Sequence, residues 1–281
     1  MLAGTSAGSV IISLLLHSKE NILERMKDFL QGYQPEEKNT NYPDKPMYDI
    51  DNFYDAVQAL HTDNKTINAF DEDVLMTAFD IGNSDKGINW DQVIFSNLDP
   101  NTANVSIVDA TVSSGAMPGM YGAYAFGAPA NPSYMIDGAF AHHDPSLIAI
   151  AYAIDNGISL DEIVLIDIGT GFMPQSLPGS DVTTWGSNQW IGVTETNADV
   201  SDLLANQSQS VPILDITLNG TNTHMVENLA SMMLPGQFAK VNPQIKDISE
   251  TDTDPKTIEY LIDQGSQADI SDAEALIKTY W

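Results

Sequence analysis

Hydrophobic positions along the chain fall into two kinds of segment that alternate. Short, largely uninterrupted apolar runs that end near Asp or Gly predict strands at 74–81, 92–95, 134–137 and 163–169. Between them, apolar residues recur every three or four positions, which predicts helices over 22–30, 50–60, 145–153, 258–262 and 273–280. The first two strands flank a turn-rich segment, 82–87, which predicts an antiparallel hairpin.

Strands that read as continuous apolar runs and alternate with helices are typical of a parallel sheet covered on both faces. We therefore expect an α/β protein, a three-layer α/β/α sandwich with a mostly parallel central sheet. Segment 163–168 is predicted as a central strand buried on both faces. Neither an internal repeat nor a linker divides the sequence, which predicts a single domain over residues 1–281. The polar segments 34–46 and 174–210 are predicted loops, the second either a lid or a solvated insertion.

Composition and charge narrow the classes of partner. Apolar residues make up 43% of the 281 residues, enough for a sizeable core. Eleven basic residues, of which Arg25 is the single arginine, face 39 acidic ones, and the net charge is -28. Nucleic acid is excluded as a partner because phosphate contacts need clustered Lys and Arg. Electrostatic docking on anionic lipid is disfavoured as well, whereas a neutral lipid interface is compatible.

Cysteine is absent, which excludes disulfides, thiolate metal sites and a Cys nucleophile. No apolar run reaches the roughly eighteen residues of a transmembrane helix. Segment 2–16 is apolar but lacks a preceding basic region, so it is not a recognisable signal peptide. A soluble protein is expected, cytoplasmic or secreted, with its compartment unassigned.

The strongest local signal is Gly4-Thr-Ser6-Ala7-Gly8, which precedes an apolar segment. This is the G-x-S-x-G pattern of a nucleophile elbow that opens a helix. We expect Ser6 in a strained backbone conformation, and a side chain at Gly4 or Gly8 should collide with a neighbouring strand or helix. The Ser6 hydroxyl would then project at a helix N-terminus, where the Ala7 N–H can meet an oxyanion. A buried serine at a glycine-rich helix start is the alternative interpretation.

A serine nucleophile needs a base, and the residues leave two arrangements open. Asp167 and His224 follow Ser6 in the order of an α/β-hydrolase triad, although those enzymes place several strands before the elbow. Alternatively Asp137 acts directly, since it ends an apolar run and Gly138 lets another backbone approach closely. We expect Ser6 and Asp137 within hydrogen-bond reach of each other at the C-terminal edge of the sheet.

A His-His-Asp run and a group of methionines could each be functional, but a structural role is the preferred interpretation of both. The run His-His-Asp at 142–144 is predicted as a helix cap, because consecutive residues rarely converge on one ion, and no metal site is predicted. Met225, Met232 and Met233 lie on a predicted helix and are interpreted as core, with an acyl-chain groove as the alternative.

In combination the motifs carry a resemblance to the patatin-like phospholipase family. Segments 4–8 and 137–139 look like the nucleophile elbow and the D-G-A/G motif of that family. Segment 110–118 resembles its helix of small residues ending in Ala-x-Pro. Segment 164–171 is similar to its strand ending in Gly-Thr-Gly, and 237–243 to its late strand ending in Asn-Pro. The order and spacing fit from residue 2 to about 265, with C-terminal helices to 281.

This resemblance implies a patatin-like fold and a serine esterase of the phospholipase A type. Ser6 would be the nucleophile and Asp137 the general base of a Ser-Asp dyad that works through an acyl-enzyme. Gly4, Ala7 and Gly8 would form the elbow and part of the oxyanion hole, with Gly138 in a supporting role. The implied substrate is a lipid or fatty-acyl ester, met in transient contact with a membrane surface. Neither a cofactor nor a metal is implied.

One departure from the family changes the expected activity. The glycine-rich oxyanion loop, of D-G-G-G-x-R-G type, precedes the elbow in the family, and the given sequence starts at Met1-Leu2-Ala3 without it or the first strand. We therefore expect little hydrolysis from these 281 residues alone. The alternatives are a catalytically silent patatin-like domain that binds lipid or protein, and an α/β-hydrolase using Ser6, Asp167 and His224. Head-group and acyl-position preference are not determined by the sequence.

Overall fold

The computed structural model describes residues 1–32, 39–41, 44–128, 130–173, 177, 179, 182–191, 211–246, 248, 252 and 254–281. Much of the two predicted loops, 34–46 and 174–210, lies outside these residues. The chain divides into two compact units, unit 1 (Met1–Pro145) and unit 2 (Ser146–Trp281). Whether the two units act as the single predicted domain stays a prediction.

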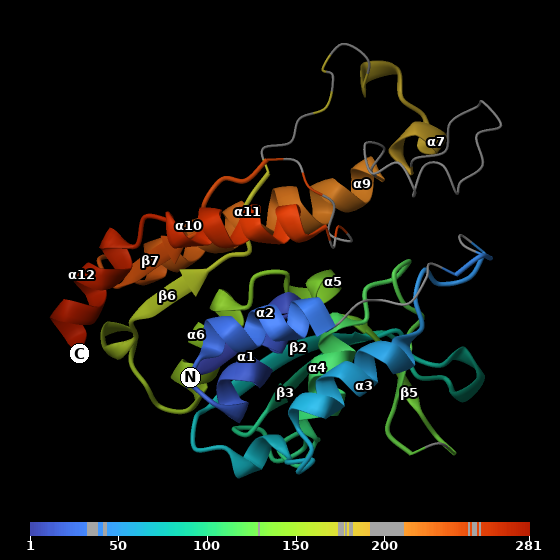
Figure 1. The fold of residues 1–281 in the computed structure, drawn as a ribbon, viewed down its shortest axis with the longest axis horizontal. Helices are drawn as coiled ribbons and strands as arrows, with labels where there is room; N and C mark the ends of the chain where they lie inside the picture. Colours follow the sequence, from blue (N-terminus) through green and yellow to red (C-terminus); the bar gives the residue numbers. More distant parts are fainter. Residues whose placement is uncertain are drawn as a thin grey trace. The chain divides into compact units, whose positions relative to one another are not determined.

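Unit 1 contains a five-stranded sheet and the helices that cover it (Figure 1). In chain order its elements are β1 (Leu2–Thr5), α1 (Ala7–His17), α2 (Ile22–Gly32), α3 (Ile50–Leu60), the 3-10 helix η1 (Ile67–Ala69), β2 (Val74–Asp80), the 3-10 helix η2 (Ser84–Lys86), β3 (Asp91–Ser96), α4 (Ile107–Gly115), β4 (Tyr124–Phe126), β5 (Ser133–Asp137) and α5 (Ala139–His142).

Strand β2 organises this sheet because three other strands pair with it. Strand β3 returns antiparallel along one edge of β2, which confirms the predicted hairpin. The other edge carries β1 in parallel beside Val74–Thr77 and then β5 antiparallel beside residues 78–80. Strand β4 pairs antiparallel with β5. The sheet is therefore mixed, and the prediction of a mostly parallel sheet is wrong because β1–β2 is the one parallel pair in it.

Alternating residues of β2 face two different layers. Val74, Met76 and Ala78 are buried in a core built with α1, α3 and α4, to which Phe53 and Val108 contribute. On the opposite face, the Thr77 hydroxyl lies 2.7 Å from that of Thr5, which donates to the carbonyl oxygen of His142 in α5. Helices thus lie on both faces of the sheet, and the predicted three-layer α/β/α fold is confirmed.

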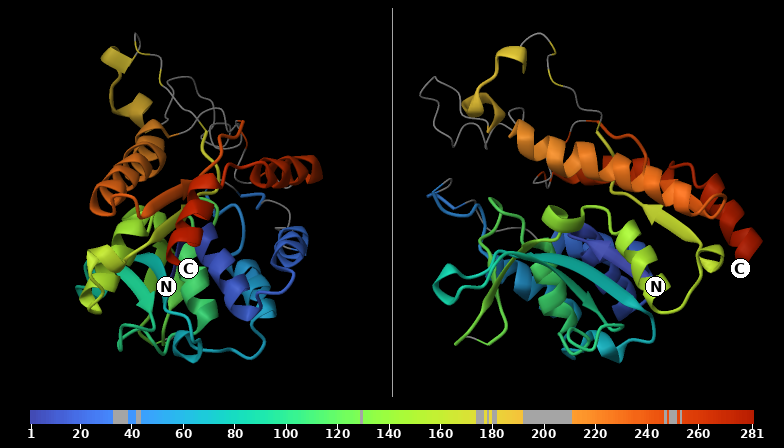
Figure 2. Two further views of the ribbon diagram at one scale, coloured as in Figure 1. Left: turned by 90° about the vertical axis from the view of Figure 1, so that its left-hand side faces the viewer. Right: turned by 180° about the vertical axis from the view of Figure 1, so that it is seen from behind.

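Unit 2 contains a second, smaller sheet between helices. Its elements are α6 (Ser146–Asp155), η3 (Leu160–Glu162), β6 (Leu165–Ile168), η4 (Val182–Thr184), α7 (Ser187–Trp190), α9 (Pro212–Asp215), the π-helix η5 (Ile216–Thr221), α10 (Asn222–Met233), β7 (Phe238–Val241), α11 (Pro255–Ser266) and α12 (Ser271–Tyr280). Strands β6 and β7 pair in parallel. Leu165 and Phe238 pack towards α6 and α10, whereas Ile166 and Ala239 pack towards α12. Figure 2 shows the strand pair and these helices as ribbons from two further sides.

Three predictions for unit 2 need correction. Strand β6 is not a central strand, because in the described residues it pairs with β7 in a separate two-stranded sheet, and Ile168 is 75% exposed. A central strand at 163–168 would leave Asp167 to be satisfied by backbone N–H groups near 169–171 or by a water, but its carboxylate has a charged partner, the Lys240 ammonium on β7 at 2.7 Å. The core interpretation of the α10 methionines is wrong, since Met225 and Met232 are 51% and 76% exposed, and Met233 is 38% exposed.

A buried histidine, His61, makes the stability of unit 1 depend on pH. His61 is 1% exposed, its Nε2 lies 2.6 Å from the Ser13 hydroxyl, and burial, aided by the nearby His17, lowers its pKa to about 4. Between pH 6.5 and 4 only the unfolded chain binds this proton, so stability falls as the pH falls through that window. From pH 7 to pH 5 this residue should cost about 2 kcal/mol of unfolding free energy.

Urea unfolding of wild type and His61→Gln at pH 7 and pH 5 measures this contribution. The variant should lose about 2 kcal/mol less than wild type over that interval, because a Gln side chain has no proton to bind. Equal losses in both proteins would show that His61 is protonated as readily in the fold as in the unfolded chain.

Candidate active site

Ser6 and Asp137 meet because β1 and β5 end against each other on the same edge of β2. Thr5, the last residue of β1, pairs with Thr77, and Asp137, the last residue of β5, pairs with the next residue, Ala78. Since β1 runs parallel to β2 and β5 antiparallel, their C-terminal ends face each other. The expected location at one C-terminal edge of the sheet is therefore wrong. The site lies partway along β2, which continues past it.

The side chains of Ser6 and Asp137 are joined directly. The Ser6 hydroxyl donates to Asp137 Oδ2 at 2.6 Å, which confirms the predicted hydrogen-bond reach. The other carboxylate oxygen, Oδ1, accepts the Ala139 N–H at 2.8 Å. Asp137 is fully buried, whereas Ser6 is partly exposed. The short turn after β5 thus fixes the carboxylate so that one oxygen faces the serine.

The backbone around Ser6 has the geometry of a sharp strand-to-helix turn. Ser6 has φ 53° and ψ -118°, a strained combination for a residue with a side chain. A Cβ on Gly4 would lie 2.7 Å from the backbone of Gly8, so the expected collision is confirmed there. At Gly8 the expectation is wrong, since a Cβ would meet no atom within 4 Å. A Cβ on Gly138 would lie 2.2 Å from the Thr77 carbonyl oxygen, which confirms the predicted close approach.

Donors are available where an oxyanion would form. Ser6 is the N-cap of α1, and its carbonyl accepts the N–H groups of Ser9 and Val10. The N–H groups of Ala7 and Gly8 bond to no residue in the part of the chain that the structure describes. Free N–H groups at the start of an eleven-residue helix are suited to an anion.

One residue at this site has no role in the sequence-based prediction. The Ser114 hydroxyl, at the end of α4, accepts the Ser6 N–H at 2.9 Å, and its carbonyl accepts the Gly138 N–H at 3.1 Å. The small-residue block 110–118 was the signal that could have indicated it. A motif of small residues predicts close packing, however, and does not say which hydroxyl is used.

Comparison with known proteins identifies the family of the chain. The model of the patatin-like phospholipase family matches residues 1–150. The chain belongs to the patatin-like phospholipase family. That match includes the elbow and the Asp-Gly motif. The chain is also 27% identical over 202 residues to the protein teg of Priestia megaterium, covering 68% of this chain and 59% of that protein.

The residues of the alternative triad have other contacts. Asp167 pairs with Lys240, and both side chains are 11% exposed. His224 lies on α10 with its side chain 74% exposed, and its Nδ1 is 3.9 Å from a carboxylate oxygen of Glu227. In the patatin-like unit 1, His142 Nε2 lies 2.5 Å from Gln92 Oε1, and burial lowers the pKa of the His142 ring. Among the described residues no three ligating side chains gather at 142–144 or elsewhere.

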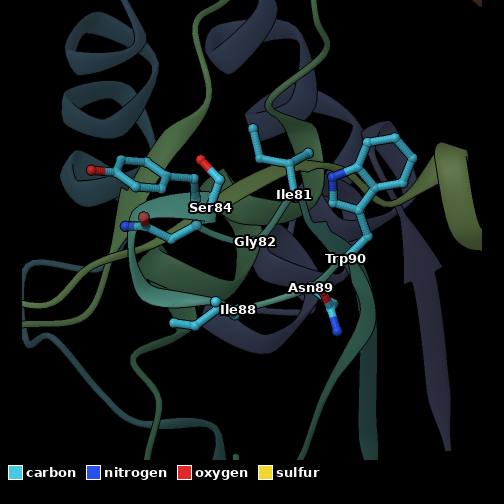
Figure 3. A pocket seen from close by; sticks show the side chains of 9 residues that line it. Ile81, Gly82, Ser84, Ile88, Asn89 and Trp90 are labelled. Atoms are coloured by element: carbon cyan, nitrogen blue, oxygen red, sulfur yellow. The ribbon is translucent and has the colours of Figure 1, made fainter.

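A cavity of about 830 Å³ lies at the tip of the β2–β3 hairpin (Figure 3). Ile81, Ile88 and Trp90 line it together with Tyr134, and neither Ser6 nor Asp137 does. This cavity is therefore separate from the dyad. None of the described helices is long and apolar enough to cross a membrane.

The different surroundings of the two elbow glycines give a matched test. Gly4→Ala should lower the unfolding free energy by about 3 kcal/mol, because its methyl group meets backbone atoms that cannot rotate away. Gly8→Ala should leave stability unchanged or raise it by up to about 1 kcal/mol, since alanine favours a helix over glycine. Urea unfolding of the two variants beside wild type measures both effects, and equal destabilisation would contradict the elbow geometry.

Proposed function

We propose that this chain hydrolyses acyl esters of lipids, at the low rate expected from its sequence, as an esterase of the phospholipase A type, with Ser6 as nucleophile and Asp137 as general base. The observation that carries the proposal is the 2.6 Å hydrogen bond from the Ser6 hydroxyl to Asp137 Oδ2 at a strained elbow. Membership of the patatin-like phospholipase family supports the substrate class.

The proposed reaction has two halves. In the first, Ser6 Oγ attacks the ester carbonyl carbon while Asp137 Oδ2 accepts the hydroxyl proton. The tetrahedral intermediate collapses, the alcohol leaves with the proton held by Asp137, and an acyl-Ser6 ester remains. In the second half, Asp137 removes a proton from water, the hydroxide attacks the acyl group, and Ser6 regains its proton as the fatty acid leaves.

The surroundings support these roles. Asp137 Oδ1 is held by the Ala139 N–H, so Oδ2 is oriented towards Ser6 without a histidine between them. The N–H groups of Ala7 and Gly8 are available for the oxyanion at the positive end of α1. Loss of one such donor typically lowers the rate by a factor of about 10² to 10³.

The charge of the chain bears on the class of lipid. A net charge of -28 opposes association with an anionic lipid surface. Uncharged esters or zwitterionic phospholipids are therefore the substrates to test first, and a p-nitrophenyl ester reports the chemistry without an interface.

Substitution of each proposed partner should separate the dyad from the triad. Ser6→Ala should abolish both p-nitrophenyl ester hydrolysis and labelling by a fluorophosphonate, since the attacking oxygen is gone. Asp137→Asn should slow labelling at least about a hundredfold, the usual scale of general-base assistance. Labelling should be followed by mass spectrometry, which detects a slow reaction and identifies the modified residue.

His224→Ala is the matched control, because the triad needs this ring and the dyad does not. Unchanged labelling in this variant, with loss in Ser6→Ala, supports the dyad. A large loss in His224→Ala, or fluorophosphonate on a serine other than Ser6, would contradict the proposal.

A further inference from the structure

Ser114 lies at the centre of a short chain of hydrogen bonds around the elbow. It is fully buried on α4, and its hydroxyl oxygen accepts the Ser6 N–H at 2.9 Å. The same oxygen lies 2.7 Å from Ser9 Oγ, which donates to the Gly4 carbonyl at 3.0 Å. Because the Ser9 proton is directed to Gly4, Ser114 must be the donor to Ser9. One hydroxyl therefore links residues before, at and after the nucleophile.

The backbone next to this hydroxyl holds the other half of the dyad. The Ser114 carbonyl accepts the Gly138 N–H at 3.1 Å, and the carbonyl of Ala116 accepts the Asp137 N–H at 3.0 Å. The end of α4 thus contacts the elbow through a side chain and the Asp-Gly turn through the backbone. The end of α4 is therefore hydrogen-bonded to the residues on both sides of the bond between Ser6 Oγ and Asp137 Oδ2.

The bond to the Ser6 N–H has a specific use at this elbow. Ser6 is an N-cap residue, so its N–H has no partner within α1, and its backbone is strained at φ 53°. Strained conformations persist only where surrounding contacts hold them. With the Ser6 N–H occupied by Ser114, the donors next to the attacking oxygen that have no partner among the described residues are the N–H groups of Ala7 and Gly8.

The neighbouring serine shows that burial alone does not explain this contact. Ser113 is as fully buried as Ser114, yet its hydroxyl has no hydrogen-bond partner among the described residues. The two serines therefore lie on the same helix and are equally buried, but only the Ser114 hydroxyl is hydrogen-bonded to the elbow among the described residues.

We infer that Ser114 is a positioning residue, which fixes the Ser6 backbone in its strained conformation and directs the free helix N–H groups to the oxyanion. The predicted effect on catalysis rests on the proposed function. The hydrogen bond to the Ser6 N–H can be tested whether or not the chain hydrolyses esters. Ser114 acts through Ser6 and touches no reacting atom.

The catalytic test compares Ser114→Ala with Ser113→Ala in the full chain. Ser114→Ala should lower kcat for a p-nitrophenyl ester ten- to a hundredfold with KM within about twofold, because small misplacements of a nucleophile have effects of this size. Fluorophosphonate inactivation should slow to the same extent at saturating probe. Ser113→Ala should change neither. Equal kcat in wild type and Ser114→Ala, or equal losses in both variants, would overturn the inference.

Hydrogen exchange at the Ser6 amide tests the positioning contact even if no hydrolysis is detected. In wild type this amide should exchange at least tenfold more slowly than the Ala7 and Gly8 amides, although all three begin the same helix. Ser114→Ala should remove that protection and Ser113→Ala should retain it. Fast exchange at Ser6 in wild type overturns the inference even where Ser114→Ala does not fold. Protection at Ser6 without Ser6-dependent hydrolysis would support the contact and count against the proposed function.

Discussion

Two neighbouring residues of β2 set the geometry on which the proposed chemistry depends. Thr77 pairs with the last residue of β1 and Ala78 with the last residue of β5, so the two strand ends are held one residue apart. Backbone pairing with β2 fixes the positions of both strand ends. The register of β1 and β5 on β2 therefore sets the distance between the backbones of Ser6 and Asp137, and this distance allows their side chains to form a hydrogen bond.

The layers on either side of β2 reinforce that register. On one face, Met76 and Ala78 are buried against α1, α3 and α4, which brings the end of α4 to the elbow. On the other face, the hydroxyls of Thr5 and Thr77 join the sheet to α5. The absence of a Cβ at Gly138 lets its backbone approach Thr77 closely. The site thus depends on contacts from the helices on both faces of the sheet as well as on the strands.

Much of this organisation could be predicted from the sequence where a local pattern has one physical cause. The elbow, the β2–β3 hairpin and the strand ending at Asp137 follow from glycine spacing and apolar runs, and all are present. The mixed direction of the sheet could not be predicted, because an apolar run indicates a strand but not the direction of its neighbour. Burial of every residue in such a run could not be predicted either, since Ile168 at the end of β6 is 75% exposed. The partner of Asp167 is Lys240, which lies 73 residues further along the chain and which no local pattern indicates. Ser114 was missed since its role depends on contacts 108 residues away along the chain.

The pair of Asp167 and Lys240 also bears on how unit 2 avoids a wrong alignment. Strands β6 and β7 are short, and most of their side chains are aliphatic. Aliphatic side chains alone would tolerate a shift of one strand along the other. A shift by one residue would turn one charged side chain to the opposite face and separate the two charges in an environment where each is 11% exposed. The loss of a buried partner costs about 3 to 5 kcal/mol, whereas the intact pair adds little net stability. We therefore expect the ion pair to act mainly by raising the free energy of misaligned forms of the strand pair, and to add little to the stability of the native one.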